Sequence, residues 1–208
     1  MTIEKQEVDY ICRLAEQAAQ DDRARITLSR TLLGPIEDAA RASGMIECCK
    51  GCAHCCYLRV EVFSFELDAI QTYLEHALDS AQLETIKHQL EETYPRVNGL
   101  TDIEHHGINV RCPFLMNDQC SIYPVRPLAC AGYNSARAAL CQRSNDDPHD
   151  TSFGIPQDPA IGYAKMRQLA LVQMALDETF EDCEELITGM CERLARQGEM
   201  PRQTAIPQ

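Results

Sequence analysis

Residues 48–56 read CCKGCAHCC, and residues 112–130 read CPFLMNDQCSIYPVRPLAC. These two blocks contain eight of the twelve cysteines of the chain. Neither block shows the apolar spacing of a buried helix or strand, so we expect both to be loops. Because core packing does not explain cysteines at this density in loops, the two blocks indicate a site at which thiols bind a metal.

The spacing of the cysteines also favours metal binding. Cys49-x-x-Cys52 allows a tight turn, which Gly51 suits, to direct two thiolates at one metal. Cys52-x-x-Cys55 repeats that spacing at once. A single pair of this kind would fit a redox motif, whereas two overlapping pairs with further cysteines downstream favour metal. The candidate ligands are Cys49, Cys52, Cys55, Cys56, Cys112, Cys120 and Cys130.

These seven candidates exceed the four ligands of a closed zinc site. The adjacent Cys55 and Cys56 are also difficult to accommodate as ligands of one ion, because consecutive side chains usually diverge. Either one of the two binds while the other has a different role, or the centre holds more than one metal atom.

The sequence around the four cysteines outside the two blocks favours core positions rather than metal ligands. Cys12, Cys183 and Cys191 each fall on an apolar helical stripe, where a buried free thiol behaves as a small hydrophobic side chain. We expect all three to pack in the core, apart from the metal. Cys141 fits a core position or a ligand, with the core preferred.

The composition narrows the class of protein. Hydrophobic residues at 45% and charged residues at 25% are ordinary for a globular chain. The net charge of −13 argues against nucleic acid, whose phosphates are neutralised by Lys and Arg. No stretch approaches the roughly 18 apolar residues of a membrane span, and the N-terminal MTIEKQEVDY has no apolar signal region. We therefore expect a cytoplasmic protein with neither nucleic acid nor a membrane as partner, and a disulfide framework is the weaker interpretation there. A protein or small-molecule partner stays open.

Apolar periodicity predicts a mainly α fold, with a single helical domain and cysteine-rich loops around a metal centre. The domain should span residues 1–197 with its motif core at 48–130, followed by a flexible tail at 198–208. Helices are expected early in the chain, the second one broken or kinked at Gly34-Pro35. Residues 58–62 allow one short strand.

A helical hairpin is predicted between the two cysteine blocks, over residues 64–94. Ser64 and Ser80 are candidate caps for its two helices, and Pro95 is a natural end. At about 1.5 Å per residue each helix spans roughly 20 Å, so the chain goes out and comes back. The hairpin would thereby return the second cysteine block to the first.

The last third of the chain is expected to hold a polar loop and two helices. The loop covers residues 142–158, and Asp158-Pro159 is a suitable cap and first turn for the long helix that follows. The predicted core face of that helix includes Met166, Leu169, Val172 and Leu176. The final helix carries one stripe made of Phe180, Cys183, Ile187, Met190, Cys191 and Leu194.

The order of these motifs resembles a known family. Cys49-x-x-Cys52-x-x-Cys55-Cys56 is followed by Cys112-Pro113-Phe114-Leu115, then by Cys120-Ser121-Ile122-Tyr123, then by Arg126-Pro127 and Cys130. This pattern is similar to the YkgJ-type cysteine-cluster family, also called the CxxCxxCC zinc- or iron-chelating domain. The resemblance implies metal chelation and gives no agreed reaction. Many relatives carry Arg directly after the last cysteine, where this chain has Ala131, so no role is carried over to that position.

The metal itself is a close choice between iron and zinc. Cys49-x2-Cys52-x2-Cys55 with a remote Cys112-Pro113 is similar to the bacterial [4Fe–4S] arrangement, in which the last cysteine precedes proline. Zinc needs fewer constraints and would also accept His54 or His149. We favour an iron–sulfur cluster narrowly.

Three hypotheses of function follow. The leading one is a metal-binding protein, with a redox or metal-handling role. The second is a cluster-dependent enzyme for methyl or redox transfer, by analogy with flagellin lysine methylases, which contain a similar cysteine domain. Arg126 and Tyr123, with the 142–158 loop, would then line a pocket and bind a cofactor or anion beside the metal. The third is a thiol–disulfide protein that uses Cys55-Cys56 or a CxxC pair.

Two of these side chains also have a structural reading. Arg126 fits an ion pair that fixes its turn about as well as a binding role, and Tyr123 fits the core. His105-His106 has no spacing typical of a metal pair, so both are expected in a surface loop.

Overall fold

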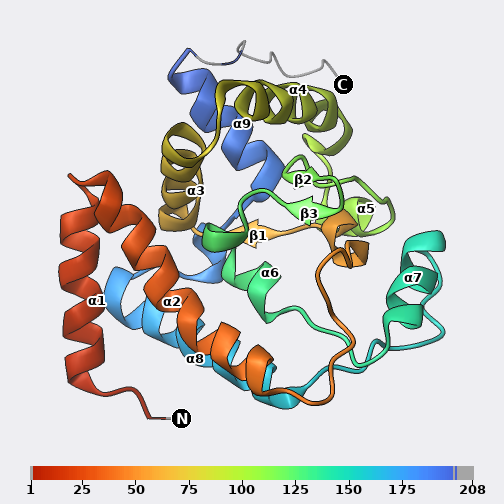
Figure 1. Cartoon of the computed structure of the whole chain (residues 1–208), viewed down its shortest axis with the longest axis horizontal. Coiled ribbons are helices and arrows are strands. Elements are labelled where there is room, and N and C mark those ends of the chain that lie inside the picture. Colours follow the sequence, from red (N-terminus) through yellow and green to blue (C-terminus); the bar gives the residue numbers. More distant parts are fainter. Residues whose placement is uncertain (1, 199, 201–208) are drawn as a thin grey trace.

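Helices make up most of the part of the chain that the structure describes, which is residues 2–198 and residue 200 of a computed structural model (Figure 1). The α-helices are α1 (Lys5–Ala18), α2 (Asp22–Ala42), α3 (Ser64–Ala77), α4 (Ser80–Val97), α5 (Asp102–His106), α6 (Leu128–Gly132), α7 (Ala138–Asp146), α8 (Pro159–Leu176) and α9 (Leu186–Arg196). The 3-10 helices are η1 (His54–Tyr57), η2 (Tyr123–Val125) and η3 (Phe180–Asp182). The strands are β1 (Glu61–Val62), β2 (Leu115–Met116), β3 (Gln119–Cys120) and β4 (Glu184–Glu185). The predicted mainly α fold is confirmed.

The helices surround two cores (Figure 1). One core lies among α3, α4 and α9, and Cys112 and Cys120 pack against it from the second cysteine block. The other lies among α1, α2 and α8, and α6 joins it through Leu128 and Ala131. The second cysteine block therefore runs from one core to the other.

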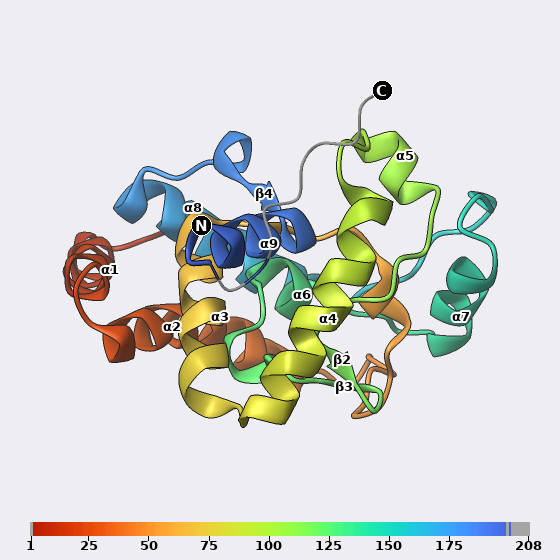
Figure 2. The ribbon, with the colours of Figure 1, turned by 90° about the horizontal axis from the view of Figure 1, so that it is seen from above.

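The two helices predicted between the cysteine blocks are confirmed: α3 and α4 are joined by two residues and spread apart from that junction (Figure 2). The cap of α4 is Asp79 rather than Ser80. Its carboxylate accepts from the Gln82 N–H at 2.8 Å, while the Gln82 side chain accepts from the Asp79 N–H at 3.1 Å. This reciprocal pair satisfies two of the N–H groups that a helix start leaves free. Ser64 is likewise the first residue of α3 rather than its cap.

Two prolines that were expected to end or bend helices lie inside them. Pro35 sits within α2, which runs unbroken to Ala42. An internal proline costs about 3 kcal/mol. Leu32, Leu33 and Ile36 around it are at most 2% exposed, and burying each contributes about 1.5–3 kcal/mol, so packing outweighs the lost hydrogen bond.

Pro95 lies in the last turn of α4, which ends two residues later at Val97. There the proline removes one of the last helical hydrogen bonds only. Tyr94 and Val97 are 8% and 3% exposed, so their burial holds the final turn in place.

Two short strand pairs join distant segments. β1 pairs antiparallel with β4, which ties the chain just after the first cysteine block to the start of α9. The short strand expected near residues 58–62 is this β1. β2 and β3 form a hairpin whose turn residues Asn117 and Asp118 have φ of 49° and 56°. Positive φ at both central residues is typical of a type I′ turn, and the pairing sets Cys120 opposite Leu115.

The segment predicted as a polar loop, residues 142–158, is helical at its start, where α7 extends to Asp146. Within α7 only Cys141 is buried, so no apolar stripe marks this helix in the sequence. α8 begins as predicted: the Asp158 carboxylate accepts from the Ala160 N–H at 2.8 Å and Pro159 occupies the first turn.

The predicted face of α8 is correct in part. Val172 is buried, and Leu169 and Leu176 pack against the core, but Met166 is 51% exposed and Leu171 is buried instead. The helix is apolar nearly all round, so its periodicity does not mark the inner face.

The final helix begins later than expected, at Leu186. Phe180 lies in η3 and is 63% exposed, because the chain extends at β4 to pair with β1. From Ile187 onward the predicted stripe is buried. The predicted flexible tail, residues 198–208, lies outside the described residues except for Gly198 and Met200.

No helix among the described residues has both the length and the apolar character needed to cross a lipid bilayer.

Candidate metal centre

The two cysteine blocks meet at η1. The N–H of Cys112 donates to the carbonyl oxygen of Cys56 at 2.7 Å, so the start of the second block lies directly beside the end of the first. Helices α3 and α4 occupy the intervening chain, which returns to this point. Long-range approach of the two blocks is therefore a property of the fold.

Four thiols from separate segments gather here, and we call them the inner thiol group: Cys55, Cys112, Cys120 and Cys130. They come from η1, from the loop before β2, from β3 and from α6, and all four are half-buried. Burial raises the pKa of the Cys112 thiol to about 12, and the nearby thiolates of Cys120 and Cys55 add to the rise.

The pKa values of Cys130 and Cys120 are also affected by burial and by neighbouring charges. Burial raises the pKa of Cys130 well above its ordinary value, and the charges of Cys112, Cys120 and Cys55 raise it further. Burial also raises the pKa of Cys120, although the positive charge of Arg126 opposes the rise. Each thiol thus lies close enough to the others for its charge to be felt.

The raised pKa values have a chemical consequence. At neutral pH these thiols keep their protons, because each thiolate would be poorly solvated and repelled by the next. A bound cation reverses this balance, since a thiol that coordinates a metal loses its proton outright. Four thiolates are the number of donors that a closed zinc site and a [4Fe–4S] cluster each require.

Cys55 and Cys56 are adjacent in η1, and the Cys56 side chain acts on the Cys55 thiol. A hydrogen bond with the Cys56 side chain is the largest cause that raises the pKa of Cys55, and burial follows. Cys56 has φ of −77° and ψ of 19°, outside helical geometry, and this bend in η1 lets the two thiols approach.

The Cys49-x-x-Cys52 turn forms as predicted, with the Cys52 N–H donating to the Cys49 carbonyl at 3.0 Å. Gly51 has φ of 88°, a left-handed conformation that glycine adopts without strain. Cys52 is half-buried, while Cys49 is exposed.

In the part of the chain that the structure describes, no three His, Cys, Asp or Glu side chains are gathered closely enough to hold a metal ion. The structure thus brings Cys55, Cys112, Cys120 and Cys130 into one neighbourhood, and the roles of all seven candidate cysteines as ligands stay a prediction. The chemistry of the donors fits zinc and iron alike, because both accept thiolate sulfur.

Glu66 is a buried group that the sequence analysis did not single out. It is 2% exposed, and its carboxylate accepts from the Phe63 N–H at 2.9 Å and from the Leu128 N–H at 2.7 Å. It therefore joins the start of α3 to the start of α6, which carries Cys130. The signal was available, since Glu66 falls on the inner face of its helix beside Leu67 and Ile70.

Arg126 makes the structural ion pair. Its guanidinium donates to Glu37 at 2.7 Å and to the Tyr123 carbonyl at 2.8 Å, and it lies 3.7 Å from the centre of the Tyr123 ring. The expectation that Tyr123 belongs to the core is wrong, because it is 57% exposed. With three residues per turn, η2 buries Val125 and turns the Tyr123 ring outward.

The two histidines considered as ligands lie in different segments. His54 begins η1 beside the thiols, whereas His149 lies against Gly107 at the end of α5. His106 is exposed as expected, but His105 is 2% exposed, so the prediction of a surface position is wrong for it. Burial, followed by the charge of Arg59, lowers the pKa of His105.

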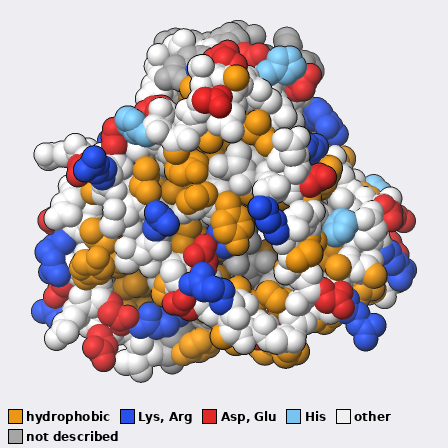
Figure 3. Space-filling view, viewed as in Figure 1, with side chains coloured by type: hydrophobic (Ala, Val, Ile, Leu, Met, Phe, Trp, Pro, Cys, Tyr) orange, Lys and Arg blue, Asp and Glu red, His pale blue; other side chains and the backbone are white. Residues whose placement is uncertain are grey.

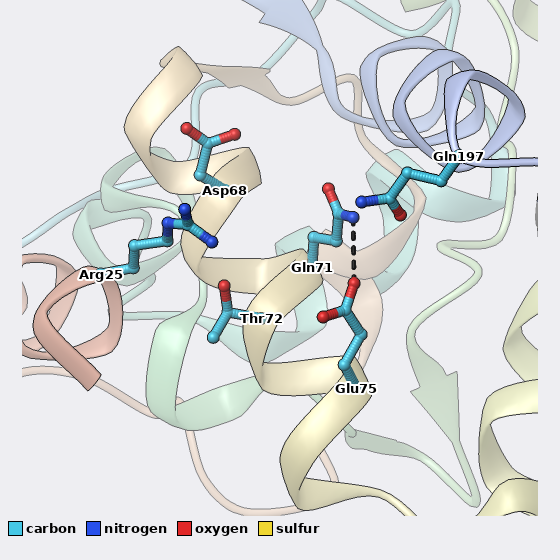
Figure 4. Close-up of a pocket in the computed structure, with 6 residues that line it drawn as sticks. All are labelled: Arg25, Asp68, Gln71, Thr72, Glu75 and Gln197. Carbon is cyan, nitrogen blue, oxygen red and sulfur yellow. Dashed lines mark hydrogen bonds between the residues drawn. The ribbon is translucent and has the colours of Figure 1, made fainter. Parts of the chain in front are cut away.

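A polar pocket of about 230 Å³ lies between α2, α3 and the end of α9 (Figure 4). It is lined by Arg25, Asp68, Gln71, Thr72, Glu75 and Gln197. None of these is a cysteine, and neither Arg126 nor Tyr123 takes part. This pocket gives no support to a substrate site beside the metal.

Comparison with known proteins identifies the family. The description "CxxCxxCC: Putative zinc- or iron-chelating domain" matches residues 48–153, which contain both cysteine blocks and α7. No curated protein and no solved structure matches the chain. Because the match covers half of the chain and includes the convergent thiols described above, the chain belongs to the CxxCxxCC family of zinc- or iron-chelating domains.

Proposed function

We propose that this protein binds an iron–sulfur cluster through thiolates drawn from its seven candidate cysteines, with the inner thiol group as the core of the site. One observation carries the proposal: Cys55, Cys112, Cys120 and Cys130 come from four segments and share one half-buried neighbourhood. Leaving so many buried thiols together without a cation would be electrostatically costly, and a metal removes that cost.

The preference for iron over zinc rests on spacing. Cys49-x2-Cys52-x2-Cys55 with Cys112-Pro113 follows the bacterial [4Fe–4S] order. Arg126 supports an anionic cluster as well, because its charge opposes the rise in the Cys120 pKa. Glu37 and Tyr123 hold that guanidinium in place, so we assign Arg126 a supporting electrostatic role beside the centre.

The role that fits this centre is electron transfer or metal handling in the cytoplasm, where thiols stay reduced. We propose that neither nucleic acid nor a membrane is the partner. The net charge of −13 opposes binding to phosphates. Figure 3 shows basic and acidic side chains interspersed on the face in view, without a continuous basic patch.

Iron, acid-labile sulfide and zinc should be measured in protein purified without oxygen, together with the absorption spectrum. We expect a brown protein with iron and sulfide in similar amounts. Cys130→Ser should lose the metal, whereas Cys12→Ser should keep it, because Cys12 donates to the Ala175 carbonyl at 3.2 Å, in contact with α8.

These measurements distinguish the identity of the metal from the existence of the thiolate centre. Colourless protein with stoichiometric zinc that Cys130→Ser abolishes would replace the cluster by zinc and leave the thiolate centre standing. Protein without iron or zinc, or equal metal in both variants, would overturn the centre itself.

A further inference from the structure

The polar pocket between α2, α3 and the end of α9 contains none of the candidate metal ligands. Four of its six lining residues share one face of α3, at helical spacings of three and four: Asp68, Gln71, Thr72 and Glu75. Arg25 of α2 and Gln197, directly after α9, complete the lining (Figure 4). Its volume of about 230 Å³ lies below the range typical of drug-sized ligands, so the pocket fits a small molecule.

Thr72 is a buried side chain whose hydroxyl lacks a partner. The residue is 2% exposed, and its hydroxyl forms no hydrogen bond with any residue that the structure describes. Thr85 and Thr93, in the next helix, instead donate to the carbonyl oxygen four residues earlier, at 2.8 Å and 2.7 Å. A buried hydroxyl without a partner lowers stability unless something else bonds to it. Because Thr72 lines the pocket, a ligand there would supply the missing hydrogen bond.

Arg25 places further donors beside this hydroxyl. Its Nε donates to the Ala18 carbonyl at 2.9 Å and its Nη1 to the Asp22 carboxylate at 2.8 Å, so one edge of the guanidinium is held. Nη2 forms no hydrogen bond within the described part of the chain, and Figure 4 shows the guanidinium turned toward α3, on the side of the Thr72 hydroxyl. A guanidinium held along one edge is a preorganised donor for a carboxylate on its other edge.

Glu75 and Gln71 offer acceptors on the same face of α3. Oε1 of Glu75 accepts from Nε2 of Gln71 at 3.0 Å, which leaves Oε2 of Glu75 and Oε1 of Gln71 without partners among the described residues. Asp68 is paired with Arg193 at 3.3 Å, whereas no Lys, Arg or His side chain in the described ranges pairs with Glu75. Glu75 is therefore the pocket carboxylate that is left to meet a positive charge from a ligand. Thr72 and Glu75 are about 4.5 Å apart along the axis of α3, so one small molecule can reach both.

We propose that this pocket binds a small polar α-amino acid, whose carboxylate lies at Arg25 and Thr72 and whose ammonium group lies at Glu75. An anion alone would meet the carboxylates of Asp68 and Glu75, and a cation alone would meet the guanidinium of Arg25. A zwitterion satisfies both signs of charge. Because all six lining side chains are polar or charged, the side chain of the ligand should be polar as well. The site is independent of the metal that we propose for the thiols.

Binding is measured by isothermal titration calorimetry of the full chain with L-serine, L-asparagine and L-glutamine. For the acid that binds most tightly, the N-acetyl derivative, which lacks the ammonium group, and the α-amide, which lacks the carboxylate, are compared. The variants are Thr72→Val, which keeps the shape of the side chain, and Glu75→Gln, which removes only the charge. Glu16→Gln, on the exposed face of α1, is the matched control. Glu75 is exposed, so its replacement leaves the cores intact and keeps the test valid if Thr72→Val fails to fold.

We expect at least one of the three amino acids to bind wild type and Glu16→Gln equally. Thr72→Val should weaken binding about tenfold, and Glu75→Gln by about 10- to 100-fold, because it removes a hydrogen bond between charged groups. Both derivatives should bind more weakly than the free acid. Absence of binding by all three amino acids, or equal binding by Glu75→Gln and Glu16→Gln, would overturn the proposal. A derivative that binds as tightly as the free acid would overturn it as well.

Discussion

Cys191 is 3% exposed in the core formed by α3, α4 and α9, and its sulfur lies 3.7 Å from the carbonyl oxygen of Leu90. Burial raises its pKa to about 12, so it stays a neutral, apolar thiol. Cys191→Ser would place a hydroxyl in the core and should lower the free energy of unfolding by about 1–3 kcal/mol. Urea denaturation measures this loss. Metal content should not change, and loss of metal would show that Cys191 was wrongly assigned to the core.

At the same scale, Glu66 makes stability depend on pH. Burial raises its pKa in the folded protein from 4.5 to about 7. Between these values the native state holds a proton that the unfolded chain has lost, so stability falls as pH rises, by about 3 kcal/mol in all. Below pH 4.5 both states are protonated and the penalty is absent.

Glu66→Gln removes this titration, although it also sacrifices one accepted hydrogen bond. The variant should be less stable at acidic pH, and the difference from wild type should shrink as pH rises through this window. Unfolding free energies at several pH values give the difference directly. Parallel curves for the two proteins would contradict the assignment.

Among the elements, the β2–β3 hairpin is the one that sets the position of Cys120. Asp118 has φ of 56°, where a β-branched residue is strained by about 1–2 kcal/mol or more. Asp118→Val should therefore lower stability by that amount and weaken metal binding. Asp118→Gly is the matched control and should be neutral or slightly stabilising. Chemical denaturation and metal competition with a chelator measure both quantities, and equal behaviour of the two variants would refute the role of the turn.

Some helices could be predicted from apolar periodicity and capping residues, and others could not. Helices α3 and α4 and the start of α8 at Asp158-Pro159 follow from apolar spacing and capping, which are local. Pro35 lies inside a helix because buried neighbours on both sides outweigh its local cost. α7 has no stripe to detect, since it buries one cysteine only.

At the scale of the whole molecule, only one of the two cores contacts candidate metal ligands among the described residues. The core of α1, α2 and α8 contains no candidate ligand, whereas Cys112 and Cys120 pack on the other core. The chain at residues 48–58 and 112–122 has only 3-10 turns and two-residue strands. Such segments open at low free energy unless something else holds them.

Metal removal by a chelator should therefore act locally. Hydrogen exchange is expected to speed up at residues 48–58, 112–122 and 138–146, while α1, α2 and α8 keep most of their protection. Mass spectrometry of the exchanged protein resolves these segments. A uniform change across all helices would contradict this picture of a site between two separate cores.

The convergence of the two cysteine blocks could be foreseen, because two helices joined by a short turn carry the chain out and back. The local arrangement of the individual thiols could not. It depends on the bend at Cys56, which turns two adjacent thiols toward each other, and on the docking of α7 against η1. His105 and Tyr123 were misplaced for a similar reason, since a single helical turn has too few residues to show which side faces inward.

The central claim is that cysteines of both blocks bind one metal centre. X-ray absorption at the metal edge of anaerobically purified protein tests it most directly. We predict a first shell of sulfur alone, at about 2.3 Å for zinc, with an additional iron shell if a cluster is present. In Cys130→Ser the sulfur shell should be lost or reduced, while Cys12→Ser should match wild type. A first shell of nitrogen and oxygen, or a sulfur shell that Cys130→Ser leaves unchanged, would contradict the account.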